Sequence, residues 1–231
     1  LDLGSFQNRD EQEVAGYAEA TNLVFDSWTE IPLTENHIRQ LHGVLLKFSF
    51  GDEHHRGKYK TVVNNVEAFD EHGRSVGVIF ETATPFDTPR MMTELVAWTN
   101  HELQDEGHHP LLVISVFVVR FLAVHPFQDG NGRLARVLTN LLLMRAGYTY
   151  MPYSSLERVI EENREQYYRA LRSAQGTLDQ GESHLIDWLL FFLLCLVSQK
   201  DVLAQKVERE RLLTTLSVLD EQILKFARQH G

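Results

Sequence analysis

The hydrophobic residues of this chain recur mostly at alternating spacings of three and four positions, which places them on one face of an α-helix. Seven segments carry this pattern, and several begin with Thr, Ser or Pro, residues that favour the first turn of a helix. The segments are residues 11–28, 34–48, 89–103, 111–124, 134–146, 155–174 and 185–207. The pattern therefore predicts an all-α fold in which the helices form a bundle.

Residues 60–82 depart from this helical spacing. Residues 61–63 and 76–80 are mostly β-branched or apolar, and the Asp-Glu-His-Gly sequence at 70–73 is typical of a turn. The segment therefore predicts a β-hairpin. An exposed strand edge can bind an extended peptide through main-chain hydrogen bonds. An ordinary hairpin that covers the bundle is the alternative, so the hairpin alone does not indicate a substrate.

A loop between two predicted helices carries the candidate chemistry. Residues 125–136 read His-Pro-Phe-Gln-Asp-Gly-Asn-Gly-Arg-Leu-Ala-Arg and lie between two apolar runs. The turn formed by Gly130, Asn131 and Gly132 leads into a helix N-terminus, where backbone N–H groups and the helix dipole favour an anion. Glycine also permits positive φ angles and a close approach of the backbone to phosphate. We expect these three residues to bind the phosphates of a nucleotide.

Four further side chains of this segment suit the same ligand. Arg133 and Arg136 are three positions apart, hence on one helix face, and their guanidinium groups can reach phosphate oxygens. Asp129 supplies a hard oxygen ligand, which we assign to a Mg²⁺ ion that bridges the phosphates. His125, a residue with an ordinary pKa of about 6.5, can accept the proton of an incoming hydroxyl. Each residue alone has a structural interpretation, but no structural need requires all of them at this spacing.

The spacing His-x-Phe-x-Asp-Gly-Asn-Gly-Arg-x-x-Arg matches the signature of the Fic-domain family at every defined position. The resemblance extends, with less distinctive residues, from residue 13 to residue 196. Family members typically transfer the AMP part of ATP to a Tyr, Thr or Ser hydroxyl of a protein. The resemblance implies a Fic-type helical bundle with a small β-hairpin flap over the active site. It also implies a Mg²⁺-dependent protein adenylyltransferase that releases pyrophosphate and docks its target protein along the hairpin at 60–82.

Two further features follow from the same resemblance. Residues 163–168 resemble the family segment whose tyrosines approach the adenine ring, and Tyr168 is carried over as a nucleotide-binding residue. Many Fic proteins also contain an inhibitory helix with the pattern Ser/Thr-x-x-x-Glu-Gly/Asn. Residues 217–222 come closest but end in Gln, so we treat that match as coincidence. Residues 11–17 resemble the segment that follows this helix, so we expect an inhibitory helix in cis, in a missing N-terminal segment, or in trans.

The expected division of the chain places a Fic catalytic domain at residues 1–205, with its core at 58–200. A C-terminal helical segment follows at 206–231. It resembles the first helix of a winged-helix module found after the catalytic domain in some family members, so we expect the start of a truncated module. The alternative is a terminal helix that packs on the bundle or on another copy of the chain in a homodimer.

The composition of the chain limits which classes of binding partner and which cellular location we expect. The net charge of −10 argues against a broad nucleic-acid surface, so nucleic acid is expected only through a C-terminal module beyond this chain. The single cysteine, Cys195, excludes a disulfide framework within the chain. The apolar run at 188–197 is shorter than the roughly 20 residues that cross a bilayer. Because the start shows no signal-peptide pattern, we expect a cytoplasmic enzyme without a membrane partner.

The motif leaves other functions open because it recognises phosphates rather than the base or the leaving group. The same site suits transfer of another nucleotide or phosphate-containing group, or the phosphorolytic removal of AMP from a protein. A different class of function is an ATP-sensing transcriptional regulator in which turnover is incidental, and another is an inactive scaffold. The presence of His125 favours an enzyme, since binding alone requires no base.

Overall fold

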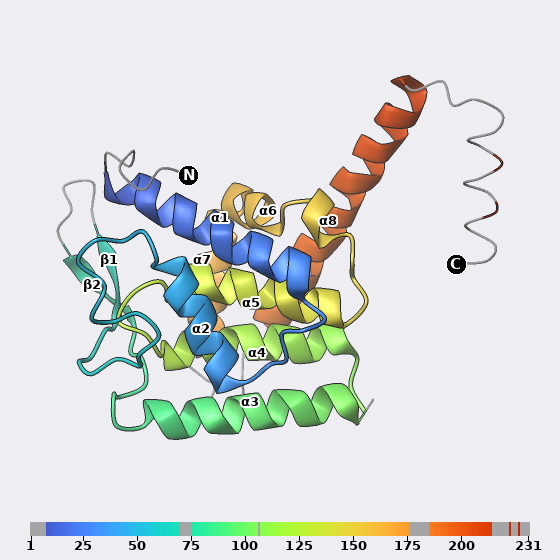
Figure 1. Ribbon diagram of the computed structural model, residues 1–231. Helices are drawn as coiled ribbons and strands as arrows, with labels where there is room; N and C mark the ends of the chain where they lie inside the picture. The colour runs from blue at the N-terminus through green and yellow to red at the C-terminus, as the bar shows by residue number, and fades with distance from the viewer. Residues whose placement is uncertain are drawn as a thin grey trace.

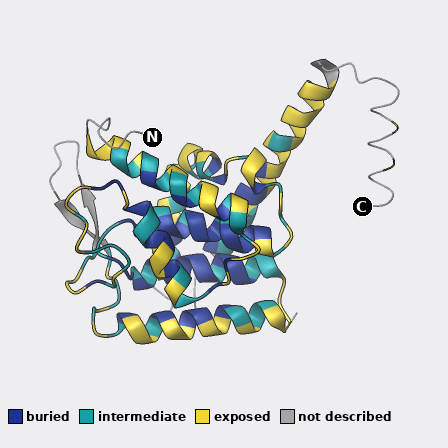
Figure 2. Cartoon of the chain, viewed as in Figure 1, coloured by how far each residue is buried: buried dark blue, intermediate teal, exposed yellow. Residues whose placement is uncertain are grey.

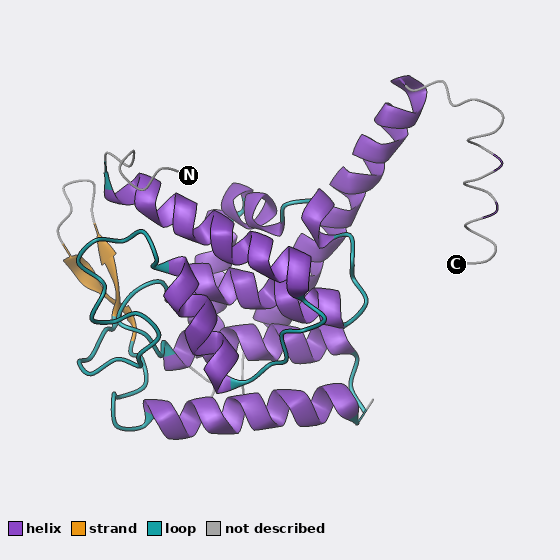
Figure 3. Ribbon diagram, viewed as in Figure 1, coloured by secondary structure: helices purple, strands orange, loops and turns teal. Residues whose placement is uncertain are grey.

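The computed structural model describes residues 8–69, 75–105, 107–175 and 185–213, together with positions 222 and 226. Within these residues the chain forms an all-α bundle with one small hairpin, which confirms the predicted fold class (Figures 1 and 3). The helices are α1 (Arg9–Ser27), α2 (Glu35–Leu45), α3 (Thr88–Gln104), α4 (Pro110–Val124), α5 (Asn131–Arg145), the short 3₁₀ helix η1 (Met151–Tyr153), α6 (Leu156–Glu162), α7 (Arg164–Gln175) and α8 (Leu185–Leu213).

Side-chain caps fix where several of these helices begin. The side chains of Asn8, Thr34 and Ser155 each accept a hydrogen bond from a backbone N–H in the first turn of the helix that follows. Such a bond satisfies one of the N–H groups that lack a partner within the helix. Thr34 and Ser155 lead two of the segments predicted from the sequence, and both helices begin directly after them.

The prediction of a single helix over residues 155–174 was wrong. The chain ends α6 at Glu162 and begins α7 at Arg164, with Asn163 at a non-helical φ of −117° between them. The Asn163 amide donates to the Val159 carbonyl oxygen at 2.8 Å. A side-chain donor of this kind competes with the backbone for helical carbonyl groups, so the helix breaks at a residue that the apolar spacing does not reveal.

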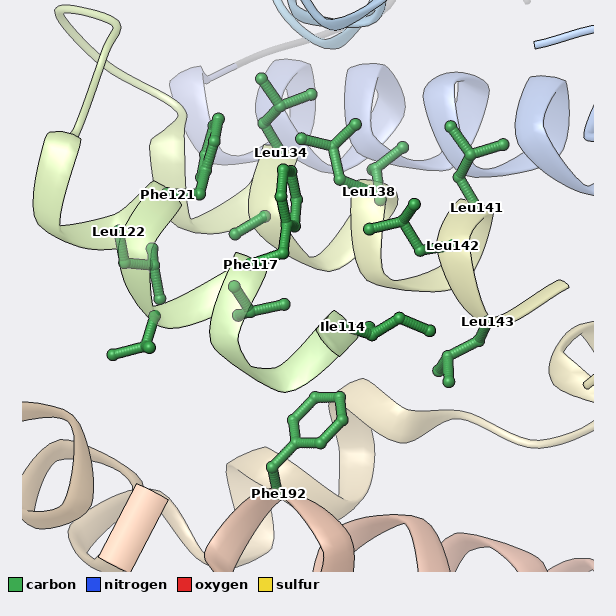
Figure 4. Close-up of a cluster of buried hydrophobic side chains, with 14 of the residues drawn as sticks. Ile114, Phe117, Phe121, Leu122, Leu134, Leu138, Leu141, Leu142, Leu143 and Phe192 are labelled. Atoms are coloured by element: carbon green, nitrogen blue, oxygen red, sulfur yellow. The ribbon is translucent and has the colours of Figure 1, made fainter. Parts of the chain in front are cut away.

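The core is built around α4 and α5, which lie side by side and connect through residues 125–130 (Figures 1 and 4). Helices α1 and α2 contact α5, while α3, α7 and α8 contact α4. Most residues of α4 and α5 are buried, whereas the outer helices expose one face to solvent (Figure 2). The central side chains include Ile114, Phe117, Phe121, Leu134, Leu138 and Phe192. The loop of residues 125–130 is therefore anchored at both ends in the buried core.

The predicted hairpin is confirmed, but its first strand was misplaced. Strand β1 (Val66–Phe69) pairs antiparallel with β2 (Ser75–Phe80), and Val66 lies opposite Phe80 (Figure 3). Residues 61–63, predicted as strand, form bends and coil instead. Since β2 ends at Phe80, opposite Val66, residues 61–63 have no strand beside them with which to pair. The predicted turn at 70–73 lies outside the described residues.

Helix α8 continues well past the bundle, and its C-terminal half projects from the body of the molecule (Figure 1). The helix runs unbroken through residues 205 and 206, where the sequence analysis divided the chain, and that division remains a prediction. Of residues 217–222, only position 222 is described. In the described part of the chain, no helix combines the length and the hydropathy needed to span a membrane.

Candidate functional site

His125 ends helix α4 in an unusual backbone conformation. Its φ of 50° and ψ of 59° are left-handed, and among the described non-glycine residues it alone has a positive φ. Its Nδ1 donates to the Leu122 carbonyl oxygen at 3.2 Å, which leaves Nε2 as an acceptor. Burial is the main reason that the pKa of His125 is lowered to about 4, and the Lys60 charge adds to this effect. The imidazole is therefore neutral at pH 7, with a free lone pair on Nε2.

The loop after His125 is held by the side chain of Asn131. Its Oδ1 accepts from the Phe127 backbone N–H at 2.9 Å, and its Nδ2 donates to the Phe127 carbonyl oxygen at 2.7 Å. Asn131 is only 1% exposed, so its side chain shapes the loop while its backbone starts α5. The N–H groups of the first three residues of α5 lack helical acceptors by geometry, and Gly132 is the second of these residues. These are the N–H groups to which the sequence analysis assigned the anion, and that binding remains a prediction.

Gly130 makes the turn into α5 possible. It has a φ of 77°, a conformation that glycine adopts without strain. A Cβ atom at this position would lie 3.1 Å from the Leu45 side chain and 3.7 Å from the His42 ring. The glycine at 130 is thus required by the backbone conformation, and helix α2 limits the space as well.

His42 on α2 supports the same loop and was missed by the sequence analysis. Its Nδ1 accepts from the Gly57 N–H at 2.9 Å, so its Nε2 carries the proton and donates to the Asp129 carbonyl oxygen at 3.0 Å. The ring also stacks on Phe127, with 3.9 Å between ring centroids and an angle of 10°. Complete burial lowers the pKa of His42 to about 4. The sequence indicates its burial only through its position on the apolar face of the 34–48 segment.

Asp129 and Arg133 belong to a closed ring of four charged side chains, which we call the charge ring: Arg9, Glu13, Arg133 and Asp129. Arg9 contacts Glu13 at 2.9 Å and Asp129 at 3.0 Å. Arg133 contacts Glu13 at 2.9 Å and Asp129 at 3.3 Å. The carboxylate predicted to hold a metal and the first predicted phosphate-binding arginine are thus both paired with side chains of α1.

Arg136 has an internal partner of its own. Its Nε lies 3.0 Å from Glu157 on α6, and its guanidinium carbon lies 5.9 Å from the centre of the Tyr17 ring. Burial and the Glu157 carboxylate raise the pKa of Tyr17, so its hydroxyl stays protonated. Both motif arginines are therefore paired with a glutamate from a neighbouring helix. No local pattern in the sequence indicates either pairing.

Two cavities adjoin these arginines. An open one of about 270 Å³ lies between α1, α5 and α6, and its lining includes Arg133, Arg136, Glu13 and Glu157. A deeper one of about 180 Å³ is bordered by Gly132 and Arg136 and is lined further in by aromatic and aliphatic side chains. The motif face of α5 is therefore accessible and continues into an apolar interior.

Tyr168 lies on the outer side of α7 and is 41% exposed. Its ring packs edge-on against Tyr167, with 5.2 Å between centroids, and Arg164 lies over its face. Tyr167 instead points inward, contacts Trp188 and Phe191, and lines the deeper cavity. The nucleotide contact predicted for Tyr168 remains a prediction.

The base of the hairpin is joined to the motif loop. The side chain of Asn64 donates to the Phe127 carbonyl oxygen at 2.5 Å, and the Lys60 backbone N–H donates to the Pro126 carbonyl oxygen at 2.8 Å. Tyr59 forms a single antiparallel β-bridge with Phe127. The segment that leads into β1 therefore lies directly against the residues that follow His125.

Comparison with known proteins agrees with this arrangement. The Fic/DOC family model matches residues 32–143, a span that includes the whole motif. A protein named protein adenylyltransferase Fic from Drosophila grimshawi is 37% identical over 90 residues, which are 39% of this chain and 17% of that protein. The relative of the same name from Culex quinquefasciatus is 37% identical over 90 residues, with the same coverage. The match thus spans only a small part of these relatives.

Solved structures resemble the chain over a longer stretch. A Fic-domain-containing signalling protein from Bacteroides thetaiotaomicron has a TM-score of 0.65 and 25% identity, and the match covers 84% of this chain and 71% of that one. Fic-1 from C. elegans has a TM-score of 0.65 at 21% identity and covers 93% of this chain and 56% of that one; this likeness concerns the fold alone. The motif, the family model and the fold all match the Fic/DOC family.

Proposed function

We propose that this protein transfers AMP from ATP to a Tyr, Thr or Ser hydroxyl of a target protein and releases pyrophosphate. The observation that carries the proposal is His125, a neutral imidazole with a free Nε2, placed just before a helix N-terminus that carries two arginines. The match to the Fic/DOC family model and the relatives named adenylyltransferases support a transferase. The whole activity is our proposal, because the matched region is 17% of the first relative's length.

His125 serves as the general base in this reaction. Its Nε2 accepts the hydroxyl proton while the hydroxyl oxygen attacks the α-phosphorus of ATP. The bond from that phosphorus to the oxygen bridging the α- and β-phosphates breaks, and the electron pair leaves with pyrophosphate. General-base help of this kind contributes about 10²–10⁴ in rate. Positioning by the loop contributes further, because proximity lowers the barrier.

The N-terminus of α5 and the two motif arginines hold the phosphates. The free N–H groups of Asn131, Gly132 and Arg133 receive the charge that develops on the phosphate oxygens. Arg133 and Arg136 release Glu13 and Glu157 and bind instead the phosphates of ATP beyond the α-phosphate. Since the glutamates already form ion pairs with these guanidinium groups, nucleotide binding replaces one set of oxygen partners with another.

Asp129 fits a Mg²⁺ ion that arrives with the nucleotide. It offers one carboxylate beside the helix N-terminus, and Mg²⁺ is commonly bound by one or two carboxylates together with phosphate oxygens and water. The carboxylate is 40% exposed, and the side chain of its partner Arg9 is 62% exposed. When bound, the ion supplies positive charge to the phosphates, which lowers their repulsion of the attacking oxygen.

The target protein docks along the hairpin of residues 60–82. Strands β1 and β2 form a two-stranded sheet, so each has an edge without a strand partner among the described residues. A target segment that adds to an edge would be held through main-chain hydrogen bonds. The attachment of the hairpin base to the loop at Pro126 and Phe127 brings such a segment near His125. This docking is independent of target sequence, so side-chain pockets must supply specificity.

A labelling experiment tests the proposed function. The protein is incubated with Mg²⁺, cell extract and ATP that carries label on the α- or the γ-phosphate. We expect protein-bound label from α-labelled ATP only, and its loss in His125→Ala. The matched control is His54→Ala, which removes an exposed histidine outside the motif. Label from γ-labelled ATP alone would indicate phosphate transfer, and ATP binding without transfer would favour the regulator.

A further inference from the structure

Lys60 is a buried cation without an acidic partner. Lys60 is 4% exposed, and its ammonium group contacts no carboxylate among the described residues. Its Nζ donates to Asn64 Oδ1 at 2.9 Å, to Thr82 Oγ1 at 2.9 Å and to the Val124 carbonyl oxygen at 3.0 Å. These three bonds use every donor of an ammonium group. Burying a charge without a carboxylate partner is unfavourable, so a lysine at this position destabilises the fold. A functional role for its charge would explain why a lysine is present.

The partners of Lys60 surround His125 along the chain. Val124 directly precedes His125, and the Lys60 backbone N–H binds the carbonyl oxygen of Pro126, which directly follows it. Asn64, held by the ammonium, donates to the His125 carbonyl oxygen at 3.4 Å. Lys60 and its partner Asn64 thus fix the peptide groups on both sides of His125. A lysine with three donors can hold this strained turn and both ends of the hairpin together.

The charge of Lys60 also acts on the imidazole. Among the described residues, the charged groups that influence His125 are Lys60, which disfavours its protonation, and Asp129, which favours it. From β2, the group that faces the imidazole is the Phe80 ring, which is uncharged and lies edge-on at 6.3 Å. Burial lowers the pKa of Lys60 itself to about 8, so the ammonium is still mostly protonated at pH 7. Lys60 therefore opposes proton uptake by His125 in the neutral range.

We propose that Lys60 is a positioning residue for His125: its hydrogen bonds fix the left-handed turn, and its ammonium group, held against that turn, disfavours a second positive charge on the imidazole. The inference rests on the proposed function, in which a neutral Nε2 accepts the hydroxyl proton. It adds a group from outside the 125–136 motif to the catalytic machinery. Position 60 therefore requires a cation, on a side chain long enough to reach these acceptors.

An NMR titration of His125 tests the charge directly and needs no substrate. The imidazole signals of isotopically labelled protein are followed with pH, and His125→Ala identifies the signal of interest. In Lys60→Met, which removes the charge and keeps the length, we expect the His125 midpoint to rise. In Lys60→Arg, which keeps the charge, the midpoint should stay near that of the wild type. Lys58→Met, which removes an exposed charge two residues away, is the matched control.

The rate of label transfer from α-labelled ATP provides the second readout. Lys60→Met leaves the burial of His125 in place, so its pKa should rise only part of the way from about 4 toward 6.5. The variant should therefore lose more rate than the wild type when the pH falls from 8 to 5. Lys60→Arg should restore the wild-type pH profile. A defect that is merely structural would lower the rate equally at both pH values, which would overturn the proposal.

The outcomes separate this inference from the proposed function. If Lys60→Met does not fold, Lys60→Gln replaces it in both measurements. A His125 midpoint that stays unchanged in the folded neutral variant would overturn the role of Lys60, whether or not the protein transfers AMP. If the wild type transfers no label, the proposed function fails, while a raised midpoint would still support the effect of Lys60 on His125.

Discussion

At the scale of single residues, the buried His42 and the half-buried His125 show how hydrogen bonds distinguish a supporting histidine from a candidate base. In His42 both ring nitrogens have partners, one on Gly57 and one on Asp129. In His125, Nδ1 binds the Leu122 carbonyl oxygen, and no residue in the described part of the chain hydrogen-bonds Nε2. Burial lowers the pKa of both rings, so both are neutral at pH 7. The free nitrogen, rather than the pKa, distinguishes the candidate base from the residue that supports its loop.

The buried neutral state of His42 makes the fold sensitive to acid. Because the pKa of His42 is about 4 in the folded chain and about 6.5 when unfolded, the unfolded state takes up the proton first as the pH falls. The stability that the neutral His42 contributes is present above pH 6.5 and is lost as the pH falls from 6.5 to 4. His42 alone should account for a loss of ~2 kcal/mol between pH 7 and pH 5. Urea unfolding at the two pH values measures this loss.

The His42→Gln variant isolates the contribution. It cannot take up a proton, so its loss of stability between the two pH values should be smaller than that of the wild type by ~2 kcal/mol. His54→Gln, a change at an exposed histidine, should keep the wild-type dependence. If His42→Gln shows the same decline as the wild type, the acid sensitivity arises elsewhere.

Gly130 offers a second prediction at this scale. Gly130→Ala should destabilise the fold by about 1–2 kcal/mol, because its φ is 77° and the new Cβ would lie 3.1 Å from Leu45. Gly43→Ala in α2 is the matched control, since it has open space and helical backbone, and should be neutral or stabilising by up to ~1 kcal/mol. Thermal unfolding of both variants measures the difference. Equal stability of the two would contradict the backbone argument.

At the scale of elements, the first turns of α1 cover the start of α5. Arg9 and Glu13 lie one helical turn apart and complete the charge ring with Asp129 and Arg133. The two ends of this contact are 120 residues apart in the chain. Helix α1 is thereby a third wall of the candidate site, beside the motif loop and the hairpin.

Removing one carboxylate of the charge ring should strengthen nucleotide binding. In Glu13→Gln, Arg133 loses an internal competitor, and a partly exposed pair of this kind is worth about 0–1 kcal/mol. We therefore expect the Kd for MgATP, measured by calorimetry, to fall by up to ~5-fold. Glu19→Gln removes a carboxylate of the same helix that pairs with Lys47, and its Kd should match the wild type. Weaker binding in Glu13→Gln would show that Glu13 supports the site rather than competes for it.

Sequence alone predicted the elements well where one helix spans a continuous apolar face. It failed at Asn163, where a side-chain hydrogen bond breaks the helix, and at 61–63, where β propensity has no strand beside it. The motif residues were predicted because their spacing is local. His42 and Lys60 were missed because their roles arise from contacts 87 and 64 residues away in the chain. No local pattern encodes such distances.

At the scale of the whole molecule, the bundle and the projecting part of α8 differ in what holds them. Every residue from 204 to 211 is exposed, so this stretch adds little to the core (Figure 2). A chain that ends at residue 205 should therefore keep its thermal unfolding temperature, with a change in stability within about 0.5 kcal/mol. Calorimetry of the full and shortened chains tests this. A clear loss would contradict the predicted division at 205/206.

The charge ring has a consequence for turnover. Because each cation of the ring already faces a carboxylate, an incoming anion gains only the difference between its own attraction and that of the resident group. In the proposed reaction, departure of the product would let the internal pairs re-form, so the protein would not be left with unpaired, poorly hydrated charges. Anion exchange at the charge ring would then resemble ligand substitution, because a returning carboxylate helps the bound anion to leave. Such exchange favours rapid release of the anion over tight binding.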